Sequence, residues 1–294
     1  MFNHLKSESH KPSRILVLGS RGFIGKQLIA ELTRQNINVL GVSSSEIDLT
    51  SPGSAESLAK ILKNDDCLVF ASAITPDKGR DIRAVMKNLT MAENVASALT
   101  ATPCAHVIYI SSDAVFGEDL PPIQESTPVA PTNLYGTMHL MREKMIASVL
   151  EKSKTPYLIL RPSALYGPGD THNSYGPNRF IRTSLKEKKI NIFGQGEEKR
   201  PHLYIEDFVA ILVKSILQQT TGLIHVVPKS SVSFGEIAQI VAQSAKNGTQ
   251  IEPLPRSGPV THKHFDPSNI LRAFPKNSFT SLESGIQNCL KSPF

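Results

Sequence analysis

Two hydroxyl side chains stand at places in the sequence where a reaction could be carried out. Ser112 follows an apolar run at residues 106–110, and Tyr135 opens a helical pattern at residues 134–151. A serine and a tyrosine that converge can hold a substrate hydroxyl or carbonyl between two hydrogen bonds, and a tyrosine with a lowered pKa can then carry the proton. His139 lies four residues after Tyr135 and therefore on the same helix face. The alternatives are a half-buried core tyrosine and a serine that caps the end of a strand.

A glycine-rich turn near the start of the chain is suited to binding a phosphate. Gly19, Gly22 and Gly25 separate an apolar run at residues 15–18 from a helical pattern at residues 27–32. Such a turn brings backbone N–H groups and a helix N-terminus against a pyrophosphate, and the helix dipole favours the negative charge. We therefore predict a dinucleotide-binding site, with a plain connection between strand and helix as the alternative.

The composition is that of an ordinary globular protein with a mildly basic surface. The 294 residues are 40% hydrophobic and carry a net charge of +6. Lysine and arginine are spread along the chain without a nucleic-acid motif, so we expect the charge to attract phosphorylated ligands and expect no nucleic-acid partner. No apolar run approaches the length of a membrane span, and residues 1–13 read as a polar, flexible leader without a signal core. These features predict a cytoplasmic protein that does not enter a membrane.

The sequence predicts neither disulfides nor a metal site. Cys67, Cys104 and Cys289 are widely spaced and odd in number, which is typical of reduced, buried side chains. His262 and His264 alternate, but no carboxylate or third ligand accompanies them.

Strand and helix patterns alternate through the first half of the chain, which predicts an α/β fold with a doubly wound parallel sheet. A loop rich in proline and glycine at residues 162–178 then leads into a smaller, less regular, mixed α/β region, and we expect a cleft between the two halves. In the second half, Ser233 and Glu236 have the spacing of a capping box. The predicted strands are 14–18, 38–42, 67–71, 106–110, 157–160, 190–193 and 223–227, and the predicted helices are 24–34, 54–63, 82–99, 134–151, 179–188, 206–217 and 282–290.

The chain resembles the extended short-chain dehydrogenases/reductases, the NAD-dependent epimerase/dehydratase family that acts on nucleotide-linked sugars. This resemblance implies a Rossmann-type domain at residues 14–165 and a substrate-binding region at residues 166–294, with elements such as residues 204–228 packing back on the first domain. It also implies a homodimer that pairs the helices at residues 82–99 and 134–151. The matching motifs are Gly19-x-x-Gly22-x-x-Gly25, Ile47-Asp48-Leu49, the run at residues 111–117, Tyr135-Gly136 with Glu143, and the runs at residues 160–169, 193–196 and 200–207.

The resemblance implies roles for the matching residues in catalysis and in cofactor binding. Ser112 would orient the substrate and Tyr135 would be the acid/base, with Asp113 and His139 beside them. The residues predicted to bind the cofactor are Gly19, Arg21, Gly22, Phe23, Ile24, Gly25, Ser43, Ser44, Asp48, Leu49, Ala71, Ser72, Ala73, Tyr135, His139, Pro162 and Ser163.

A second set of residues is predicted to bind the nucleotide diphosphate and sugar of the substrate. A guanidinium fork suits a diphosphate, so the chemistry of arginine supports two of these predictions independently of the resemblance. A solvated surface position is the alternative for Arg256 and for the loop residue His172. The set is Ser112, His172, Asn178, Arg179, Arg200 and Arg256.

Two positions depart from the family pattern. His139 replaces the family's lysine, and a histidine is shorter and, with an ordinary pKa near ~6.5, largely neutral at pH 7. Either it supports a variant site by bonding the ribose or relaying a proton, or the redox chemistry is impaired; in a working site, activity is expected to fall as His139 loses its proton. Ala114 follows Asp113 where the family's sugar 4,6-dehydratases carry a glutamate, so elimination by that mechanism is not expected.

The choice of nicotinamide cofactor is predicted from the end of the second strand. An NAD enzyme usually has an acidic residue there for the ribose hydroxyls. Here the strand runs into Ser43 and Ser44 without an acid, and Arg21 lies inside the glycine turn. Serines and an arginine accept a 2′-phosphate, which favours NADP over NAD. The alternative is that Arg21 points to solvent, in which case it does not distinguish the two cofactors.

The sequence therefore predicts an NAD(P)-dependent epimerase of a nucleotide-activated sugar in which Tyr135 moves protons. A reductase of a keto-sugar nucleotide that uses NADPH is the alternative favoured by the NADP-like features. A catalytically silent dinucleotide-binding or regulatory protein is the alternative raised by His139.

Overall fold

The computed structural model describes residues 2–170, 173, 176–256 and 258–292. The chain forms two compact units, and each draws on separated segments of the sequence. The first unit comprises Met1–Phe116, Pro128–Pro162 and Val209–His225, and the second comprises Gly117–Thr127, Ser163–Phe208 and Val226–Phe294.

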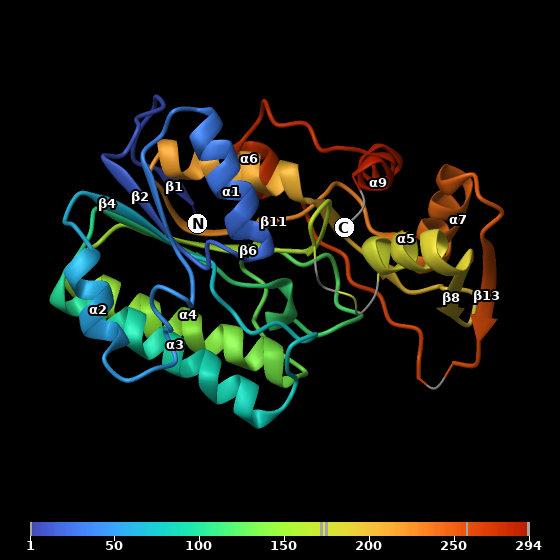
Figure 1. Ribbon diagram of the computed structural model, residues 1–294, viewed down its shortest axis with the longest axis horizontal. Helices are drawn as coiled ribbons and strands as arrows, with labels where there is room; N and C mark the ends of the chain where they lie inside the picture. The colour runs from blue at the N-terminus through green and yellow to red at the C-terminus, as the bar shows by residue number, and fades with distance from the viewer. Residues whose placement is uncertain (1, 171–172, 174–175, 257, 293–294) are drawn as a thin grey trace. The chain divides into compact units, whose positions relative to one another are not determined.

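The first unit is built on a seven-stranded sheet in the order β1-β11-β6-β5-β4-β2-β3 (Figure 1). Strands β2 to β6 pair in parallel, and β1 pairs antiparallel with β11. The central strands are buried and rich in branched apolar residues, as expected for a parallel sheet that is covered on both faces. The strands are β1 Asn3–His4, β2 Arg14–Leu18, β3 Val39–Val42, β4 Asp66–Phe70, β5 His106–Ile110, β6 Tyr157–Pro162 and β11 Thr220–Val226.

Helices cover both faces of this sheet, so the predicted α/β class and doubly wound architecture are confirmed. Helices α2, α3 and α4 lie on one face and α1 and α6 on the other (Figure 1). On the first face, sheet residues such as Phe70 and Val107 pack with Val95 of α3 and Ile146 of α4. The helices are α1 Phe23–Arg34, α2 Ser54–Ile61, α3 Ile82–Ala101, α4 Leu134–Ser153 and α6 Ile205–Leu217.

The beginning of the chain differs from the flexible leader expected from the sequence. Asn3 pairs with Thr221 and His4 with Thr220, so that β1 covers the free edge of β11. His4 Nδ1 also lies 2.8 Å from Thr220 Oγ1. A two-residue strand is too short to show a periodicity in the sequence. Its pairing depends on a partner more than two hundred residues away.

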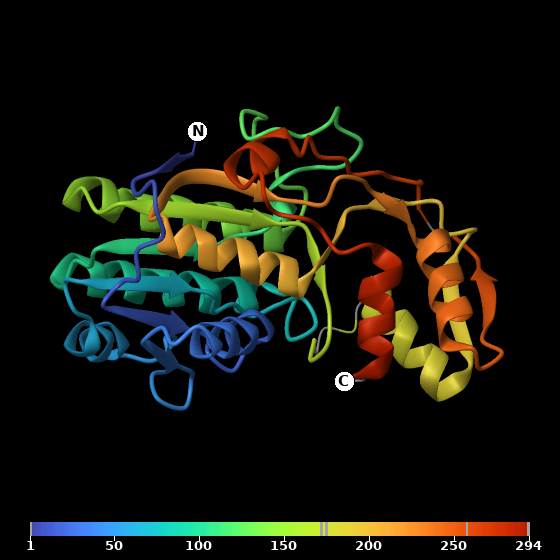
Figure 2. The same cartoon turned by 90° about the horizontal axis from the view of Figure 1, so that it is seen from above.

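The second unit is assembled from helices and short two-stranded sheets (Figure 2). Its apolar core joins Tyr166, Ile181, Tyr204, Ile237 and Ile286. Parallel pairs form between β7 and β10 and between β8 and β13, and β9 pairs antiparallel with β12. The elements are β7 Ala164–Tyr166, α5 Gly176–Glu187, β8 Lys189–Phe193, β9 Lys199–Arg200, β10 His202–Tyr204, β12 Val232–Ser233, α7 Phe234–Ala245, β13 Gln250–Leu254, α8 Ser268–Ala273 and α9 Leu282–Lys291.

Two local features of the second unit bear on the sequence analysis. The capping box of α7 is confirmed: Ser233 Oγ accepts from the Glu236 backbone N–H at 3.1 Å, and the Glu236 carboxylate accepts from the Ser233 N–H at 2.7 Å. Gly117–Thr127 belongs to this unit although the sequence places it in the first domain, because Ile123 bridges to Phe265.

None of the described helices combines the length and the apolar character that a membrane crossing requires.

Candidate functional site

The glycine turn between β2 and α1 leaves a helix N-terminus open to an anion. A Cβ on Gly25 would stand 2.1 Å from the Gly19 carbonyl oxygen, so the helix can approach the turn this closely only with glycine there. Gly22 is the N-cap of α1 and offers no side-chain cap, and the first turn holds no acidic residue. The first N–H groups of the helix are therefore left for a negatively charged ligand, which fits the pyrophosphate of a dinucleotide.

Other residues predicted to bind the cofactor follow the neighbouring strands. Ser72, between Ala71 and Ala73 after β4, approaches the turn so closely that a Cβ on Gly19 would stand 2.9 Å from its backbone nitrogen. Leu49 instead belongs to the buried core of the first unit. Residues 23 and 24 are half-buried at the start of α1, and Asp48 is exposed and accepts a hydrogen bond from the Thr50 N–H at 2.9 Å.

An acidic residue, Glu46, lies just after β3, which is the strand at residues 38–42 in the sequence analysis. The Glu46 carboxylate folds back and accepts from the Ser43 N–H at 2.8 Å and from the Ser43 hydroxyl. These bonds lower the pKa of Glu46 to about 2. Arg21 reaches the same carboxylate at 3.5 Å, and both side chains are largely exposed, at 70% and 50%. The expectation that no acid lies at this strand end is thus wrong, while Ser44 remains exposed beside it.

Ser112 and Tyr135 are placed by two neighbouring elements, the short helix η1 (Asp113–Val115) and α4. Ser112 Oγ caps η1 by accepting from the Ala114 N–H at 3.1 Å, so the capping reading of this serine is confirmed. Helix α4 packs against η1, and a Cβ on Gly136 would stand 1.9 Å from the Ala114 carbonyl oxygen. This close approach brings the first turn of α4, with half-buried Tyr135, to the end of β5 that carries Ser112.

His139 is buried and neutral. Its Nδ1 lies 2.8 Å from the Tyr109 hydroxyl, and its ring meets the Tyr135 ring edge-on with centroids 4.6 Å apart. Burial lowers the pKa of His139 well below its ordinary value, and the positive charge of Arg142 lowers it further. His139 is therefore uncharged near neutral pH, and the loss of the imidazolium proton, to which the expected fall in activity is tied, moves to a pH well below its ordinary value.

A buried ion pair braces α4 against the sheet behind these residues. Arg161, on β6, donates to Glu143 from Nε at 2.9 Å and from a terminal nitrogen at 2.7 Å. Ser111 Oγ donates to the same carboxylate at 2.5 Å. Pro162, the last residue of β6, and Ser163 after it are both buried, and Ser163 Oγ has no hydrogen-bond partner among the residues that the structure describes.

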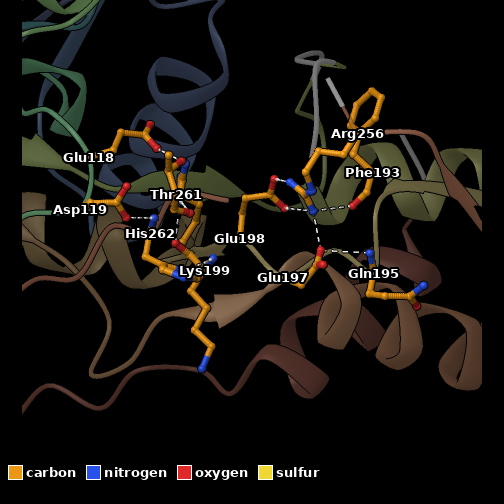
Figure 3. A network of polar contacts seen from close by, with 11 residues as sticks. Glu118, Asp119, Phe193, Gln195, Glu197, Glu198, Lys199, Arg256, Thr261 and His262 are labelled. Carbon is orange, nitrogen blue, oxygen red and sulfur yellow. Dashed lines mark hydrogen bonds and ion pairs between the residues drawn. The ribbon is translucent and has the colours of Figure 1, made fainter. Parts of the chain in front are cut away.

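Arg200 and Arg256, predicted to bind a diphosphate, lie in the second unit beside carboxylates, and Figure 3 shows Arg256 between Glu197 and Glu198. Arg200 pairs with Glu118 and donates to the Thr261 carbonyl oxygen at 2.7 Å. Arg256 pairs with both Glu197 and Glu198. A diphosphate that bound either arginine would compete with these carboxylates, because terminal guanidinium nitrogens already donate to them.

The other predicted substrate residues lie on or before α5. Asn178 is buried and donates to the Asp170 carboxylate, while its Oδ1 has no hydrogen-bond partner among the described residues. Arg179 is exposed. His172 lies outside the described residues.

Comparison with known proteins decides the family. The profile of the NAD dependent epimerase/dehydratase family matches residues 15–226. The chain belongs to this family. The resemblance drawn from the sequence motifs is therefore confirmed, and relatives of this epimerase/dehydratase chain include nucleotide-sugar epimerases, dehydratases and reductases.

Individual relatives of this epimerase/dehydratase chain are distant in sequence but similar along nearly its whole length. An uncharacterised UDP-glucose epimerase of Bacillus subtilis (strain 168) is 26% identical over 312 residues, which cover 94% of this chain and 96% of the relative. The UDP-glucose 4-epimerase of Thermus thermophilus, solved with NAD, has a TM-score of 0.83 at 17% identity and covers 95% of this chain and 98% of its own. A GDP-L-fucose synthetase of Naegleria fowleri bound to NADP has a TM-score of 0.84 at 18% identity and covers 98% and 96%. The two structural likenesses show that this chain shares the fold of those proteins.

The sequence analysis did not identify several residues that lie near the predicted site residues in the fold. Tyr109 is an ordinary apolar-run residue of β5 in the sequence, yet its hydroxyl holds His139. Arg142 could have been found, because position 142 follows Tyr135 by seven residues and shares its helix face. Glu118 carried no local signal, since its partner Arg200 is far along the chain.

Proposed function

We propose that this protein is an NAD(P)-dependent epimerase of a nucleotide-activated sugar. The observation that carries the proposal is the pairing of two features in the first unit: a helix N-terminus open to a pyrophosphate, and Tyr135 beside the strand end that bears Ser112. Ser112 orients a sugar hydroxyl, and Tyr135 removes and returns its proton. When bound, the nicotinamide supplies the hydride chemistry.

A one-way reduction of a keto-sugar nucleotide is the second candidate. It is favoured by Arg21 and Ser44, whose exposed guanidinium and hydroxyl suit the 2′-phosphate of NADPH, whereas the buried Ser43 hydroxyl already donates to Glu46. A silent dinucleotide-binding protein is the third candidate, since neutral His139 cannot supply a fixed positive charge. In the substrate complex we propose contacts from Asn178, with Arg179, Arg200 and Arg256 facing the diphosphate.

One experiment separates these candidates. The purified protein is mixed with stoichiometric NADPH or NADH and a panel of sugar nucleotides that includes 4-keto forms, and reduced-nicotinamide absorbance is followed with product identity. Interconversion of two sugars without a net change in absorbance is the result expected for an epimerase. Stoichiometric loss of absorbance would show a reductase instead, and cofactor binding without turnover of any sugar would show a silent protein.

Replacing Glu46 by glutamine is expected to strengthen NADPH binding several-fold and to change NADH binding less than two-fold. The ionised carboxylate competes with a 2′-phosphate for Arg21, and the pair is exposed enough to break readily. Dissociation constants from fluorescence titration measure the effect, with Glu56→Gln on exposed α2 surface as the matched control. Unchanged or weaker NADPH binding in Glu46→Gln would contradict the proposed phosphate site.

We also propose a homodimer that joins copies of α3 and α4, which pack together in the first unit (Figure 1). These helices expose Ile82 and Met86 on α3, at 70% and 56%, and Leu134 and Met141 on α4. Met86→Asp is expected to halve the mass measured by light scattering, whereas Phe193→Asp, which changes an exposed apolar residue of the second unit, is expected to leave it unchanged. A wild-type protein that is monomeric would refute the proposal.

A further inference from the structure

Arg142 is a charged side chain that lies wholly inside the first unit. It has no exposed surface. One terminal nitrogen donates to the Ser72 carbonyl oxygen at 2.7 Å, and the other donates to Asn88 Oδ1 at 3.3 Å. The guanidinium carbon lies 4.4 Å from the centroid of the Phe70 ring and 5.2 Å from that of Tyr109. Carbonyl dipoles and aromatic faces therefore hold the cation in place.

The positive charge of Arg142 is not neutralised by a carboxylate within the described part of the chain. No ion pair joins Arg142 to an acidic residue there, and its Nε has no hydrogen-bond partner there either. The neighbouring Glu143 is already bound by Arg161 and Ser111. Burying a cation without a partner anion costs folding free energy. The cation therefore stabilises a negative charge that forms nearby.

Tyr135 is the group on which such a negative charge can form. Positions 135, 139 and 142 share one face of α4, since they are spaced by four and three residues. The Tyr135 ring meets the ring of His139, whose Nδ1 faces the Tyr109 hydroxyl, and Arg142 lies over the Tyr109 ring. A continuous set of contacts thus connects the guanidinium to Tyr135.

The other charged and titratable groups around Tyr135 do not supply a free positive charge. Tyr109 on β5 stays a neutral phenol, because burial raises its pKa. Glu143 and Arg161 neutralise each other, and Asp113 of η1 is an acid. His139 is neutral, partly because a second positive charge beside Arg142 is disfavoured.

We propose that Arg142 is a positioning residue for proton transfer, whose buried positive charge favours the phenolate form of Tyr135 where neutral His139 cannot. The phenolate of Tyr135 takes the proton of a sugar hydroxyl, so that a phenol O–H bond forms as the sugar O–H bond breaks. When Tyr135 returns the proton, the phenol O–H bond breaks, its electron pair stays on the phenolate oxygen, and Arg142 stabilises that charge. The inference rests on the proposed role of Tyr135 as the acid/base.

The test measures ionisation of Tyr135 directly in the purified full-length protein. Tyrosinate absorbance is titrated against pH in each variant, and the same titration with Tyr135→Phe in that background is subtracted. Arg142→Met is expected to raise the pKa of Tyr135 by about one to two units, as expected for a charge several ångströms away at an effective dielectric constant near ~20. Arg142→Lys keeps the charge and is expected to shift this pKa less, and Lys144→Met removes an exposed cation of α4 as the matched control.

Moving the cation to a second position of α4 gives a readout independent of Arg142→Met alone. The double variant His139→Lys/Arg142→Met moves the cation one turn along α4, and we expect it to restore the pKa of Tyr135 toward the wild-type value. A folded variant without either cation but with an unchanged Tyr135 pKa would overturn the inference, as would a double variant that titrates like free tyrosine. Because absorbance needs no substrate, the shift can appear in a protein that turns over no sugar, and that result would reject the proposed function alone.

Discussion

Replacing Tyr135 by phenylalanine is expected to lower turnover of the nucleotide sugar about 10²- to 10⁴-fold, the usual contribution of a positioned acid/base group. The phenylalanine ring keeps the edge-on contact with His139, and Gly136 still allows α4 to approach η1. The variant therefore loses the hydroxyl and little else. Single-turnover kinetics on the sugar that the wild-type protein converts measure the loss.

Two further measurements make the Tyr135→Phe result specific. The dissociation constant of the nicotinamide cofactor is expected to stay within a few-fold of wild type, because the glycine turn lies on other elements of the first unit. Tyr157→Phe is the matched control, since the Tyr157 hydroxyl donates to nearby Glu151, at 2.9 Å, and Tyr157 is not among the predicted site residues. A Tyr135→Phe protein that kept more than a tenth of wild-type turnover would show that another group moves the proton.

Removing the carboxylate of Glu143 is expected to lower the free energy of unfolding by about 3–5 kcal/mol, the usual cost of leaving a buried charge unpaired. Arg161 and Glu143 are 5% and 4% exposed, and two hydrogen bonds join them. In Glu143→Ala the guanidinium stays inside the sheet–helix interface, and the Ser111 hydroxyl also loses its acceptor. Urea unfolding followed by circular dichroism measures the loss.

The double variant Glu143→Ala/Arg161→Met is expected to recover part of this stability, because it removes both buried charges. Glu31→Ala is the matched control: it breaks the pair with Arg34 on the exposed face of α1, and a much smaller change is expected. If Glu143→Ala and Glu31→Ala lowered stability equally, the buried pair would not brace α4 against the sheet.

Much of the fold follows from local patterns in the sequence. The run of buried aliphatic residues at β2 and the glycines after it specify strand, turn and helix within a dozen residues. Asn133 and Ser233 mark the starts of α4 and α7, since each side chain accepts a hydrogen bond from a backbone N–H three residues on. Such capping interactions are local, which is why the capping box of Ser233 and Glu236 is predicted from the sequence alone.

Very short strands, and the unit to which a segment belongs, cannot be predicted from local sequence patterns. Strands β1 and β10 are two and three residues long, too short for an alternation to be recognised. Gly117–Thr127 joins the second unit because distant segments contact it, Phe265 at Ile123 and Arg200 at Glu118.

For the candidate site, the sequence by itself determined which residues can do the chemistry. Residue type and spacing identify Ser112 at a strand end, Tyr135 in the first turn of a helix, and the glycines of the turn. This is possible because the strands and helices of an α/β fold can be predicted from sequence patterns, and ligands bind at the carboxyl ends of its strands.

The tertiary structure alone decided the charges that these residues meet. Burial makes His139 neutral and leaves Arg142 as the nearby cation. A loop that folds back sets Glu46 against Arg21, and distant glutamates reach Arg200 and Arg256. The protonation state and partner of a side chain depend on its desolvation and on charges brought near by folding, and neither quantity is written in the local sequence.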